Sequence, residues 1–342
     1  MKAVVWLGPR HMEMQDVAQP TPAPDEVVLA VDSVGICGSE LSGYLGHNSL
    51  RVPPLIMGHE FAGRVATIGD NVAALRPGDR VTVNPLIGCG TCTACRQGLE
   101  NLCAQRQIIG IHRPGAFAGF VSVPALNCTT IPDSLSLVAG SLAEPLACGV
   151  RATSVGNVTD GSRVLVIGAG TIGLMCIAAA QRAGGSVVLA ADVNEGRLAA
   201  AKRWGAGATC DVRTSDMAEM AHQLTDGLGV DVVIDAVGTT DTRRAAIDAV
   251  RLGGTVVFIG LHEGESLLQA NHIVRSEIHI TGSFTYTQAD FAEAVAMLVD
   301  GTVQPSVDWL EERDLEECDD SFAELIDNPP PVAKIVLRPN GS

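Results

Sequence analysis

The sequence predicts a two-domain α/β protein, in which a barrel-like β unit precedes a doubly wound parallel sheet. At 342 residues, the chain is longer than one hydrophobic core usually serves. Residues 1 to about 125 alternate short apolar runs with turn signals, a pattern typical of an all-β unit. From about residue 160, apolar runs alternate with Ala-rich helical stretches, which indicates parallel βαβ units.

The expected strands follow these apolar runs in chain order. In the β unit they cover Val27 to Val31, Gly63 to Ile68, Arg80 to Val83 and Phe117 to Val123. In the βαβ part they cover Val164 to Ile167, Val187 to Ala190, Val232 to Ile234 and Val256 to Ile259. Apolar residues at helical spacing predict a helix over 287–303, and Val332 to Leu337 predicts a last strand. We expect both to return to the first unit.

The composition disfavours several classes of protein. The net charge of −16 opposes binding to nucleic acid or to an anionic membrane. The longest apolar segments run to about ten residues, well short of the roughly 20 that cross a bilayer, and the N-terminus lacks a signal-peptide core. Ten cysteines without an export signal are typical of the reducing cytoplasm, where we expect the protein to work.

Four cysteines in one short stretch form the strongest motif. Cys89, Cys92, Cys95 and Cys103 are separated by gaps of two, two and seven residues, so four thiolates can converge on one tetrahedral Zn²⁺. A four-sulfur zinc site is closed and leaves no position for a substrate, so we expect this zinc to be structural. An iron-sulfur cluster is the alternative, although these gaps fit its usual runs less well.

A glycine-rich turn follows the first strand of the βαβ part. The turn reads Gly168-Ala169-Gly170-Thr171-Ile172-Gly173, and Leu174 to Arg182 continues as a helix. After a strand and before a helix, this pattern is typical of dinucleotide binding. Gly168 makes the tight turn, Gly170 lets the backbone approach the pyrophosphate, and Gly173 lets the helix pack on the strand. The helix N-terminus, with Thr171 and Ile172, would face the phosphates.

An acidic residue indicates which dinucleotide binds. Asp192 ends the next apolar strand, about 20 residues on, where a carboxylate accepts the adenosine ribose hydroxyls. Because this carboxylate would repel a 2′-phosphate, the sequence favours NAD over NADP. Arg197 follows in the next predicted helix, where it could either flank the ribose or soften that repulsion.

A second metal-binding motif resembles that of a known family. Gly58-His59-Glu60-Phe61-Ala62-Gly63, followed by Gly69 and Val72, resembles the zinc signature of the medium-chain dehydrogenase/reductase superfamily, the zinc alcohol dehydrogenases. The Cys37-Gly38-Ser39 stretch, the four-cysteine lobe, the dinucleotide turn and the Gly205-Ala206 step fit the same pattern in the same order. The resemblance therefore covers essentially the whole chain.

This resemblance implies a domain organisation. It predicts a GroES-like β-barrel catalytic domain over 1–148 and 289–342, with the structural zinc lobe at 86–104, and a Rossmann coenzyme domain over 149–288. Members of the family are dimers or tetramers, commonly joined edge to edge through strands near Val256 to Ile259 and Ile278 to Gly282. We therefore expect a homo-oligomer.

The family also has a catalytic zinc, so the resemblance implies two zinc ions per chain. A cysteine and a histidine that match Cys37 and His59 hold this second zinc. The third ligand separates subfamilies, and the Glu144-Pro145 pair resembles the polyol dehydrogenases, including sorbitol dehydrogenase. We expect Glu144 as the resident third ligand and Glu60 as an occasional one. Cys148 is a rival thiolate, although its apolar neighbours favour a packed core cysteine.

The implied reaction is the oxidation of an alcohol. Three protein ligands leave a fourth position on zinc for the substrate oxygen. Zinc lowers the pKa of the alcohol, which then passes hydride to C4 of the nicotinamide. By the resemblance, Ser39 passes the hydroxyl proton outward, and Glu60 and Glu144 act beside the metal.

Three positions depart from the family pattern. Glu40 stands where an aspartate commonly orients the histidine ligand, so we expect the same hydrogen bond with altered geometry. Ser42 replaces a relay histidine, which leaves the ribose hydroxyls with water, or His47, as the proton exit. Thr285 replaces an arginine of the sorbitol dehydrogenases, while Tyr286 remains a candidate for the substrate pocket.

The predicted function is a zinc- and NAD-dependent oxidation of a secondary alcohol, in a polyol or a vicinal diol, to the ketone. Alternatives within the enzymes are a butanediol-type or simple secondary alcohol dehydrogenase and a sugar-phosphate polyol dehydrogenase. Arg113 and Arg275 are the candidate phosphate ligands for the last of these. The alternative from another class is a non-catalytic NAD-binding sensor, which would lack the catalytic ligands that this chain carries.

Overall fold

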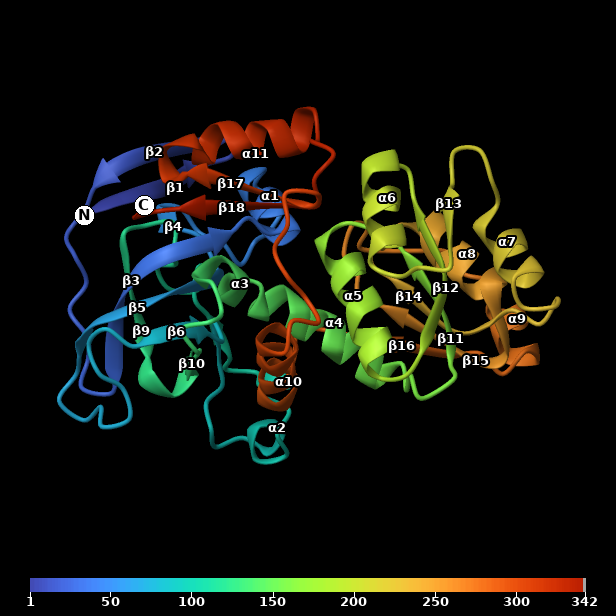
Figure 1. Cartoon of the computed structure of the whole chain (residues 1–342), viewed down its shortest axis with the longest axis horizontal. Coiled ribbons are helices and arrows are strands. Elements are labelled where there is room, and N and C mark those ends of the chain that lie inside the picture. Colours follow the sequence, from blue (N-terminus) through green and yellow to red (C-terminus); the bar gives the residue numbers. More distant parts are fainter. Residues whose placement is uncertain (341–342) are drawn as a thin grey trace. The chain divides into compact units, whose positions relative to one another are not determined.

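The structure is a computed structural model that describes residues 1–340. The chain forms two compact units, 1–144 with 287–342 (unit 1) and 145–286 (unit 2) (Figure 1). The domain limits expected from the sequence, 148/149 and 288/289, lie four and two residues further along the chain. Helix α4 (Ala143–Val155) crosses the first limit, and the chain returns to unit 1 just before α10 (Gln288–Val299).

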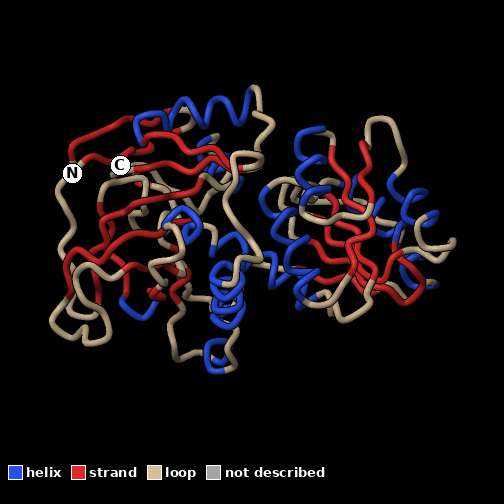
Figure 2. The backbone as a smooth tube through the Cα atoms, viewed as in Figure 1, coloured by secondary structure: helices blue, strands red, loops and turns tan. Residues whose placement is uncertain are grey.

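Unit 1 is mainly antiparallel β structure, drawn red in Figure 2. Its main sheet has the order β10-β6-β5-β3-β18-β17, with β9 also paired to β3, and the smaller sheets are β2-β1-β4 and β7-β8. The strands are β1 (Lys2–Gly8), β2 (His11–Asp16), β3 (Glu26–Gly35), β4 (Leu55–Ile56), β5 (Glu60–Ile68), β6 (Arg80–Val83), β7 (Leu86–Ile87), β8 (Gln107–Ile108), β9 (Phe120–Pro124), β10 (Cys128–Thr130), β17 (Leu310–Asp314) and β18 (Lys334–Arg338).

Short helices connect these strands. They are α1 (Gly38–Tyr44), α2 (Thr93–Arg96), α3 (Leu137–Ser141), α11 (Cys318–Asp327) and the 3-10 turns η1 (Glu100–Leu102), η2 (Ala125–Asn127) and η3 (Leu315–Glu317). The predicted helix over 287–303 is α10, which ends four residues earlier, and the predicted last strand is β18. Both lie in unit 1, as expected.

The register of the main sheet positions the predicted catalytic residues. The end of β3 pairs with the start of β5, with Gly35 opposite Glu60, and β18 pairs with β3 on the other side, with Val336 opposite Gly35. The segments that carry Cys37, His59 and Lys334 therefore meet at one end of three neighbouring strands.

Unit 2 is a six-stranded parallel sheet with the order β13-β12-β11-β14-β15-β16. Its strands are β11 (Arg163–Ile167), β12 (Ser186–Asp192), β13 (Ala208–Asp211), β14 (Val230–Asp235), β15 (Val250–Phe258) and β16 (His279–Gly282). Its further helices are α5 (Thr171–Arg182), α6 (Glu195–Arg203), α7 (Met217–Gln223), α8 (Thr240–Ala249) and α9 (Ala270–Arg275). This strand order is that of the doubly wound dinucleotide-binding fold, whose switch point lies between the first and fourth strands, here β11 and β14.

Hydrophobic burial explains why these runs form strands. In β11, Val164 to Ile167 are all buried, because helices cover both faces of a parallel sheet. In β3, the apolar residues Val27, Leu29 and Val31 join the core of unit 1. Several strand starts differ from the prediction: β5 and β15 begin earlier, at Glu60 and Val250, and β9 begins later, at Phe120 instead of Phe117. Phe117 instead serves a loop contact, since its carbonyl accepts from Val4 N at 2.8 Å.

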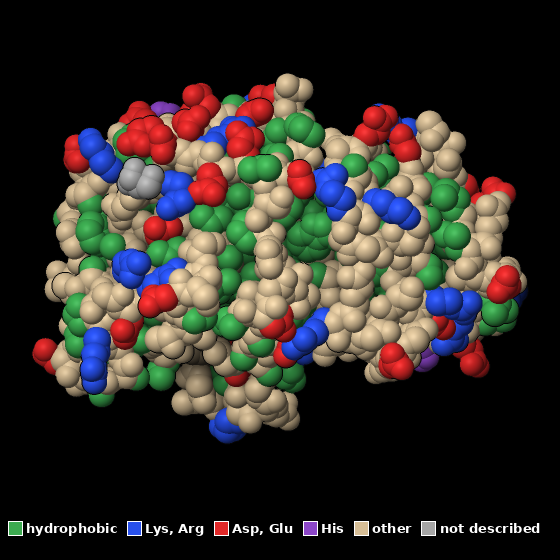
Figure 3. Space-filling view, in the orientation of Figure 1, with side chains coloured by type: hydrophobic (Ala, Val, Ile, Leu, Met, Phe, Trp, Pro, Cys, Tyr) green, Lys and Arg blue, Asp and Glu red, His purple; other side chains and the backbone are tan. Residues whose placement is uncertain are grey.

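The surface reflects the acidic composition. Acidic side chains are spread over the face of the molecule drawn in Figure 3, interspersed with fewer basic ones, in line with the net charge of −16. Among residues 1–340, none of the helices combines the length and the apolar character needed to cross a membrane.

Candidate metal centres and dinucleotide site

The four-cysteine lobe brings its sulfurs together. Cys89, Cys92, Cys95 and Cys103 each offer a sulfur, and these atoms all lie within 4.8 Å of one another. The chain winds around them, because α2 begins at its cap residue Cys92, and η1 leads into Cys103. Backbone N–H groups of Cys92 and Cys95 point at the sulfurs of Cys89 and Cys92, at 3.4 and 3.5 Å. The donor set fits a closed tetrahedral zinc.

The clustered thiols of this lobe favour the binding of a cation. Backbone hydrogen bonds, the one involving Thr91 above all, lower the pKa of Cys89 to about 6, so that one thiolate forms near neutral pH. Desolvation, together with the neighbouring sulfurs, raises the pKa of Cys95 to about 12. Four sulfurs so close together do not all ionise unless a positive ion is shared among them. The close approach of the four sulfurs therefore favours a bound divalent metal.

A second group of possible ligands lies in unit 1. Cys37, His59 and Glu60 each offer one ligand atom, and these three atoms lie within 4.8 Å of one another. Cys37 caps the N-terminus of α1, and His59 immediately precedes β5, which begins with Glu60. His59 and Glu60 are buried, while Cys37 is half-buried. One thiol, one imidazole and one carboxylate suit a catalytic zinc.

Glu40 orients the histidine of this group. Its Oε1 lies 2.7 Å from Nδ1 of His59 and also accepts from Gly58 N at 2.9 Å, while its Oε2 accepts from Cys37 N at 3.0 Å. The expected hydrogen bond from position 40 is thus confirmed. It leaves Nε2 of His59 as the ring nitrogen for a metal.

The same surroundings set the protonation of His59 when no metal is bound. Burial alone would lower its pKa, but the carboxylate of Glu40 and the sulfur of Cys37 outweigh that effect and hold the pKa well above its ordinary value. Proton and metal therefore compete for this imidazole.

A buried lysine accompanies Glu60. Nζ of Lys334 forms an ion pair with Glu60 Oε2 and donates to the carbonyl of Ile36 at 2.9 Å. Both side chains are 1% exposed. Gly35 makes room for them, because a Cβ atom there would clash with Glu60 Oε2 and with Cε of Lys334. No sequence motif pointed to Lys334, since it lies 274 positions from Glu60.

Three other residues considered for the catalytic site lie outside the compact ligand group. Glu144, expected as the resident zinc ligand, is buried at the start of α4, but the compact ligand group contains Glu60 in its place. Its ligand role stays a prediction. Cys148, expected to be a packed core cysteine, is half-buried, and it too lies outside the group. Tyr286 is 1% exposed at the end of unit 2, and its substrate role also stays a prediction.

Ser39 has an arginine neighbour that the sequence did not suggest. Its hydroxyl donates to Cys37 Sγ at 3.5 Å and accepts from Nη2 of Arg51 at 3.2 Å. The phosphate role of the two candidate arginines stays a prediction. Arg113 pairs with Glu26 at 2.7 Å, and Arg275 lies exposed at the end of α9. Arg51, the neighbour of Ser39, lies in a loop outside any motif, so the sequence alone offered no reason to single it out.

The glycine-rich turn has the geometry of a dinucleotide site. Gly168 has a φ of +88°, and a Cβ atom on Gly173 would clash with the carbonyl oxygen of Gly168. A Cβ atom on Gly170 would meet no protein atom within 4 Å, so the backbone there faces open space where a pyrophosphate fits. Thr171 and Ile172 form the first turn of α5 behind it.

Asp192 holds the same turn from the neighbouring strand. Its Oδ2 accepts from Ala169 N at 2.7 Å and its Oδ1 from Asn194 N at 2.8 Å, at the carboxyl end of β12. Each carboxylate oxygen retains a free lone pair for a ribose hydroxyl. Arg197 lies in the first turn of α6, and its buried Nε has no partner among the described residues.

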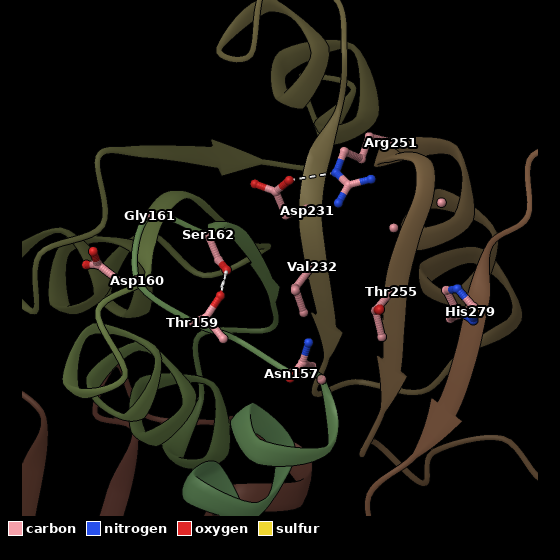
Figure 4. Close-up of a pocket in the computed structure, with 13 residues that line it drawn as sticks. Asn157, Thr159, Asp160, Gly161, Ser162, Asp231, Val232, Arg251, Thr255 and His279 are labelled. Atoms are coloured by element: carbon pink, nitrogen blue, oxygen red, sulfur yellow. Dashed lines mark hydrogen bonds and ion pairs between the residues drawn. The ribbon is translucent and has the colours of Figure 1, made fainter.

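A separate hollow of about 480 Å³ lies at the opposite end of the same sheet. Figure 4 shows Asp231 facing Arg251, with Thr255 and His279 on the adjacent strands. The charges are already paired, since Arg251 Nε lies 2.6 Å from Asp231 Oδ1. None of the predicted site residues lines it.

Comparison with known proteins agrees with this picture. The alcohol dehydrogenase GroES-like domain matches residues 23–133, and the zinc-binding dehydrogenase domain matches residues 171–300. Fold and site together define a metal-dependent, dinucleotide-linked dehydrogenase. The chain belongs to the zinc alcohol dehydrogenase family of medium-chain dehydrogenases/reductases, in its polyol dehydrogenase branch.

Individual relatives span nearly the whole chain. The sorbitol dehydrogenase of Bacillus subtilis is 33% identical over 346 residues, 99% of this chain and 98% of that protein. The D-arabitol-phosphate dehydrogenase of Enterococcus avium is 31% identical over 92% of this chain and 94% of its own length. A solved zinc-binding dehydrogenase from Sinorhizobium meliloti, bound to NADP, is 33% identical with a TM-score of 0.91, and 99% of each chain is covered.

Proposed function

We propose that the protein is a zinc-dependent dehydrogenase that oxidises a secondary alcohol, in a polyol or a vicinal diol, to the ketone, with NAD⁺ as the hydride acceptor. The observation that carries the proposal is the oriented ligand group of unit 1: His59, held by Glu40, beside Cys37 and Glu60. This group stands apart from the closed four-sulfur lobe, so a metal bound there is free to meet a substrate.

Each residue of the group has a distinct task. Cys37 and His59 are proposed as permanent zinc ligands, with Glu60 or Glu144 as the third. Zinc in this position supplies a Lewis acid that lowers the pKa of an alcohol. Glu40 fixes the orientation of His59, and Lys334 holds Glu60 close to the group. Ser39 is half-exposed beside Cys37, in a position to accept the hydroxyl proton.

The coenzyme is proposed to be NAD, with its pyrophosphate at Gly170 and its adenosine ribose at Asp192. The carboxylate of Asp192 favours free ribose hydroxyls over a 2′-phosphate. The positive charge of Arg197 would instead favour the 2′-phosphate of NADP, and a relative of this chain binds NADP. Comparing the dissociation constants of NADH and NADPH decides between the two.

The relatives that act on sorbitol and on arabitol phosphate support a polyol substrate. Sorbitol itself is the weaker candidate, because Thr285 replaces the arginine of sorbitol dehydrogenases. Thr285 has a φ of +47° and a buried hydroxyl without a partner among the described residues, so this segment differs chemically from theirs.

The decisive experiment compares wild-type protein with His59→Ala. NADH formation is followed spectroscopically with a panel of neutral polyols, acidic polyols and vicinal diols, and NAD binding is measured separately by calorimetry. We expect turnover in the wild type, its loss in the variant, and NAD binding by both. If the wild type binds NAD but turns over none of the panel, the sensor interpretation replaces the enzyme.

We also propose that the protein is a homo-oligomer, a dimer or a tetramer, of the cytoplasm. Strand β16 is the last strand of its sheet and, within the part of the chain that the structure describes, pairs only with β15, so its outer edge can pair with the same strand of a second copy. The four-cysteine lobe favours a reducing compartment, because its thiols have to stay reduced to bind a metal.

A further inference from the structure

Arg51 is a buried arginine without an ion-pair partner among residues 1–340. It is 3% exposed, although Leu50 and Val52 on either side are 55% and 69% exposed. The loop between α1 and β4 therefore runs along the surface and turns this one side chain inward. Arginines are almost never fully buried unless they are paired. The packing of the loop alone does not explain this arrangement.

The guanidinium lies beside the proposed catalytic zinc site. Nη2 of Arg51 donates to Ser39 Oγ at 3.2 Å, and this hydroxyl lies 3.5 Å from Cys37 Sγ. The side chain crosses α1 at Gly43, where a Cβ atom would clash with Cδ of the arginine. A glycine in this helix therefore lets the arginine reach Ser39. Both Ser39 and Cys37 are half-buried, so the neighbourhood is accessible from their side.

Most of the hydrogen-bonding capacity of Arg51 is unused. Its Nε and Nη1 are buried and have no partner within residues 1–340. The carboxylate of Glu40 does not supply one, because its oxygens accept from Gly58, His59 and Cys37. Burial lowers the pKa of Arg51 despite the nearby Glu40 and Cys37, as expected for a cation that lacks sufficient counter-charge.

We propose that Arg51 binds an anionic group of the substrate, a carboxylate or a phosphate, and thereby makes acidic polyols the preferred substrates. This inference rests on the proposed function, because it takes the Cys37–His59–Glu60 group as the place of the reacting hydroxyl. The planar guanidinium presents several N–H donors that match either anion, and such charge-assisted bonds are stronger than neutral ones. The bound anion would supply the negative charge that Arg51 lacks in the protein itself.

Distance and chemistry both allow this arrangement. Arg51 contacts Ser39, and Ser39 contacts Cys37, so a single residue separates the guanidinium from the ligand group. A polyol of a few carbons is therefore long enough to place one hydroxyl at the ligand group and its acidic end at Arg51. A neutral polyol would leave the buried donors without an acceptor of opposite charge, which costs binding energy. The competing explanation is structural: Arg51 merely balances the charges of Cys37 and Glu40.

The test uses three substrates with the same six-carbon chain: sorbitol, gluconate and sorbitol 6-phosphate. For zinc-loaded wild type, Arg51→Met and Arg51→Lys, kcat/KM is measured with NAD, and the dissociation constant of each compound is measured by calorimetry without NAD. We expect wild type to prefer one or both anions, and Arg51→Met to lose about 10- to 100-fold on the anions but less than about threefold on sorbitol. Arg51→Lys should recover part of the loss, since it keeps the charge but not the fork.

The two anions distinguish the source of the charge. A preference for gluconate identifies a carboxylate, and a preference for the phosphate identifies a phosphoryl group. Arg76→Met is the matched control, because it removes an exposed arginine of unit 1 that has no role in the proposed site and should change none of these values. Zinc content and circular dichroism establish that each variant is folded and loaded.

Two results would overturn the inference. One is equal binding of sorbitol and both anions by the wild type. The other is an equal loss on all three compounds in Arg51→Met, which would establish the structural explanation. If the wild type oxidises nothing, the proposed function fails, whereas the binding measurements still decide whether Arg51 recognises an anion.

Discussion

Oε1 of Glu40 lies 2.7 Å from Nδ1 of His59, and both side chains are buried. This contact joins helix α1 to the start of β5 and leaves the other ring nitrogen available to a metal held with Cys37 and Glu60. A glutamate performs this task although it is one methylene longer than the aspartate common in the family. The extra length is accommodated because Glu40 also accepts from two backbone N–H groups, which hold its carboxylate in place.

The first prediction concerns this contact. Glu40→Gln should weaken zinc binding at the catalytic centre roughly 10- to 100-fold, because a neutral amide orients the imidazole less firmly and stabilises the metal-bound ring less. Competition with a chromophoric chelator measures the affinity. The four-sulfur lobe is an internal control, since its zinc should be released at the wild-type rate. Unchanged affinity at the catalytic centre would show that Glu40 is dispensable.

The second prediction is a pH dependence of zinc binding. The pKa of His59 is raised in the metal-free protein, so zinc must displace a proton that remains bound well above the ordinary histidine range. Affinity should fall as the pH decreases, by about tenfold per unit for each displaced proton. Calorimetry in buffers of different ionisation enthalpy counts these protons. A pH-independent affinity between about pH 6 and 8 would contradict the assignment of His59 as a ligand.

The third prediction separates the two metal centres. Cys95→Ser should leave one zinc per chain instead of two and lower the unfolding temperature, because the lobe loses one of four ligands and its thiol cluster loses the cation that links it. Metal analysis and thermal unfolding measure these effects. Residual zinc-dependent turnover by the folded fraction is expected. A variant that retains two tightly bound zinc ions would exclude the structural assignment.

The fourth prediction compares two glycines of one turn. Gly170→Ala should raise the dissociation constant of NADH at least about tenfold, because the methyl group occupies the space for the pyrophosphate, while stability changes by less than about 1 kcal/mol. Gly173→Ala should instead destabilise unit 2, because its methyl group clashes with the carbonyl of Gly168. Calorimetric NADH binding and urea unfolding test both variants. The opposite pattern would place the coenzyme elsewhere.

The fifth prediction addresses assembly. Ile280→Lys introduces a charge on the outer edge strand β16, where Ile280 is 37% exposed, and should shift the protein toward the monomer. Size-exclusion chromatography with light scattering measures the mass. Leu126→Lys, which changes a 93% exposed residue of unit 1, is the control and should leave the mass unchanged. A wild-type monomer would contradict the proposal directly.

The sequence by itself determined the fold and most of the chemistry of this protein. Strands β6 and β11 follow from apolar runs between turn residues, and the thiols of the four-cysteine lobe follow from their spacing, because all these signals are local. The same holds for the turn at Gly168, whose strand and helix adjoin it in the chain.

The tertiary structure alone decided what surrounds the proposed zinc ligands. Glu60 was already expected beside His59, but its pairing with Lys334 and the contact of Arg51 with Ser39 exist only in the folded chain. A lysine in the last strand and an arginine in a surface loop carry no local pattern. Their positions depend on strand pairing across some three hundred residues and on the space left by Gly35 and Gly43, which no short stretch of sequence records.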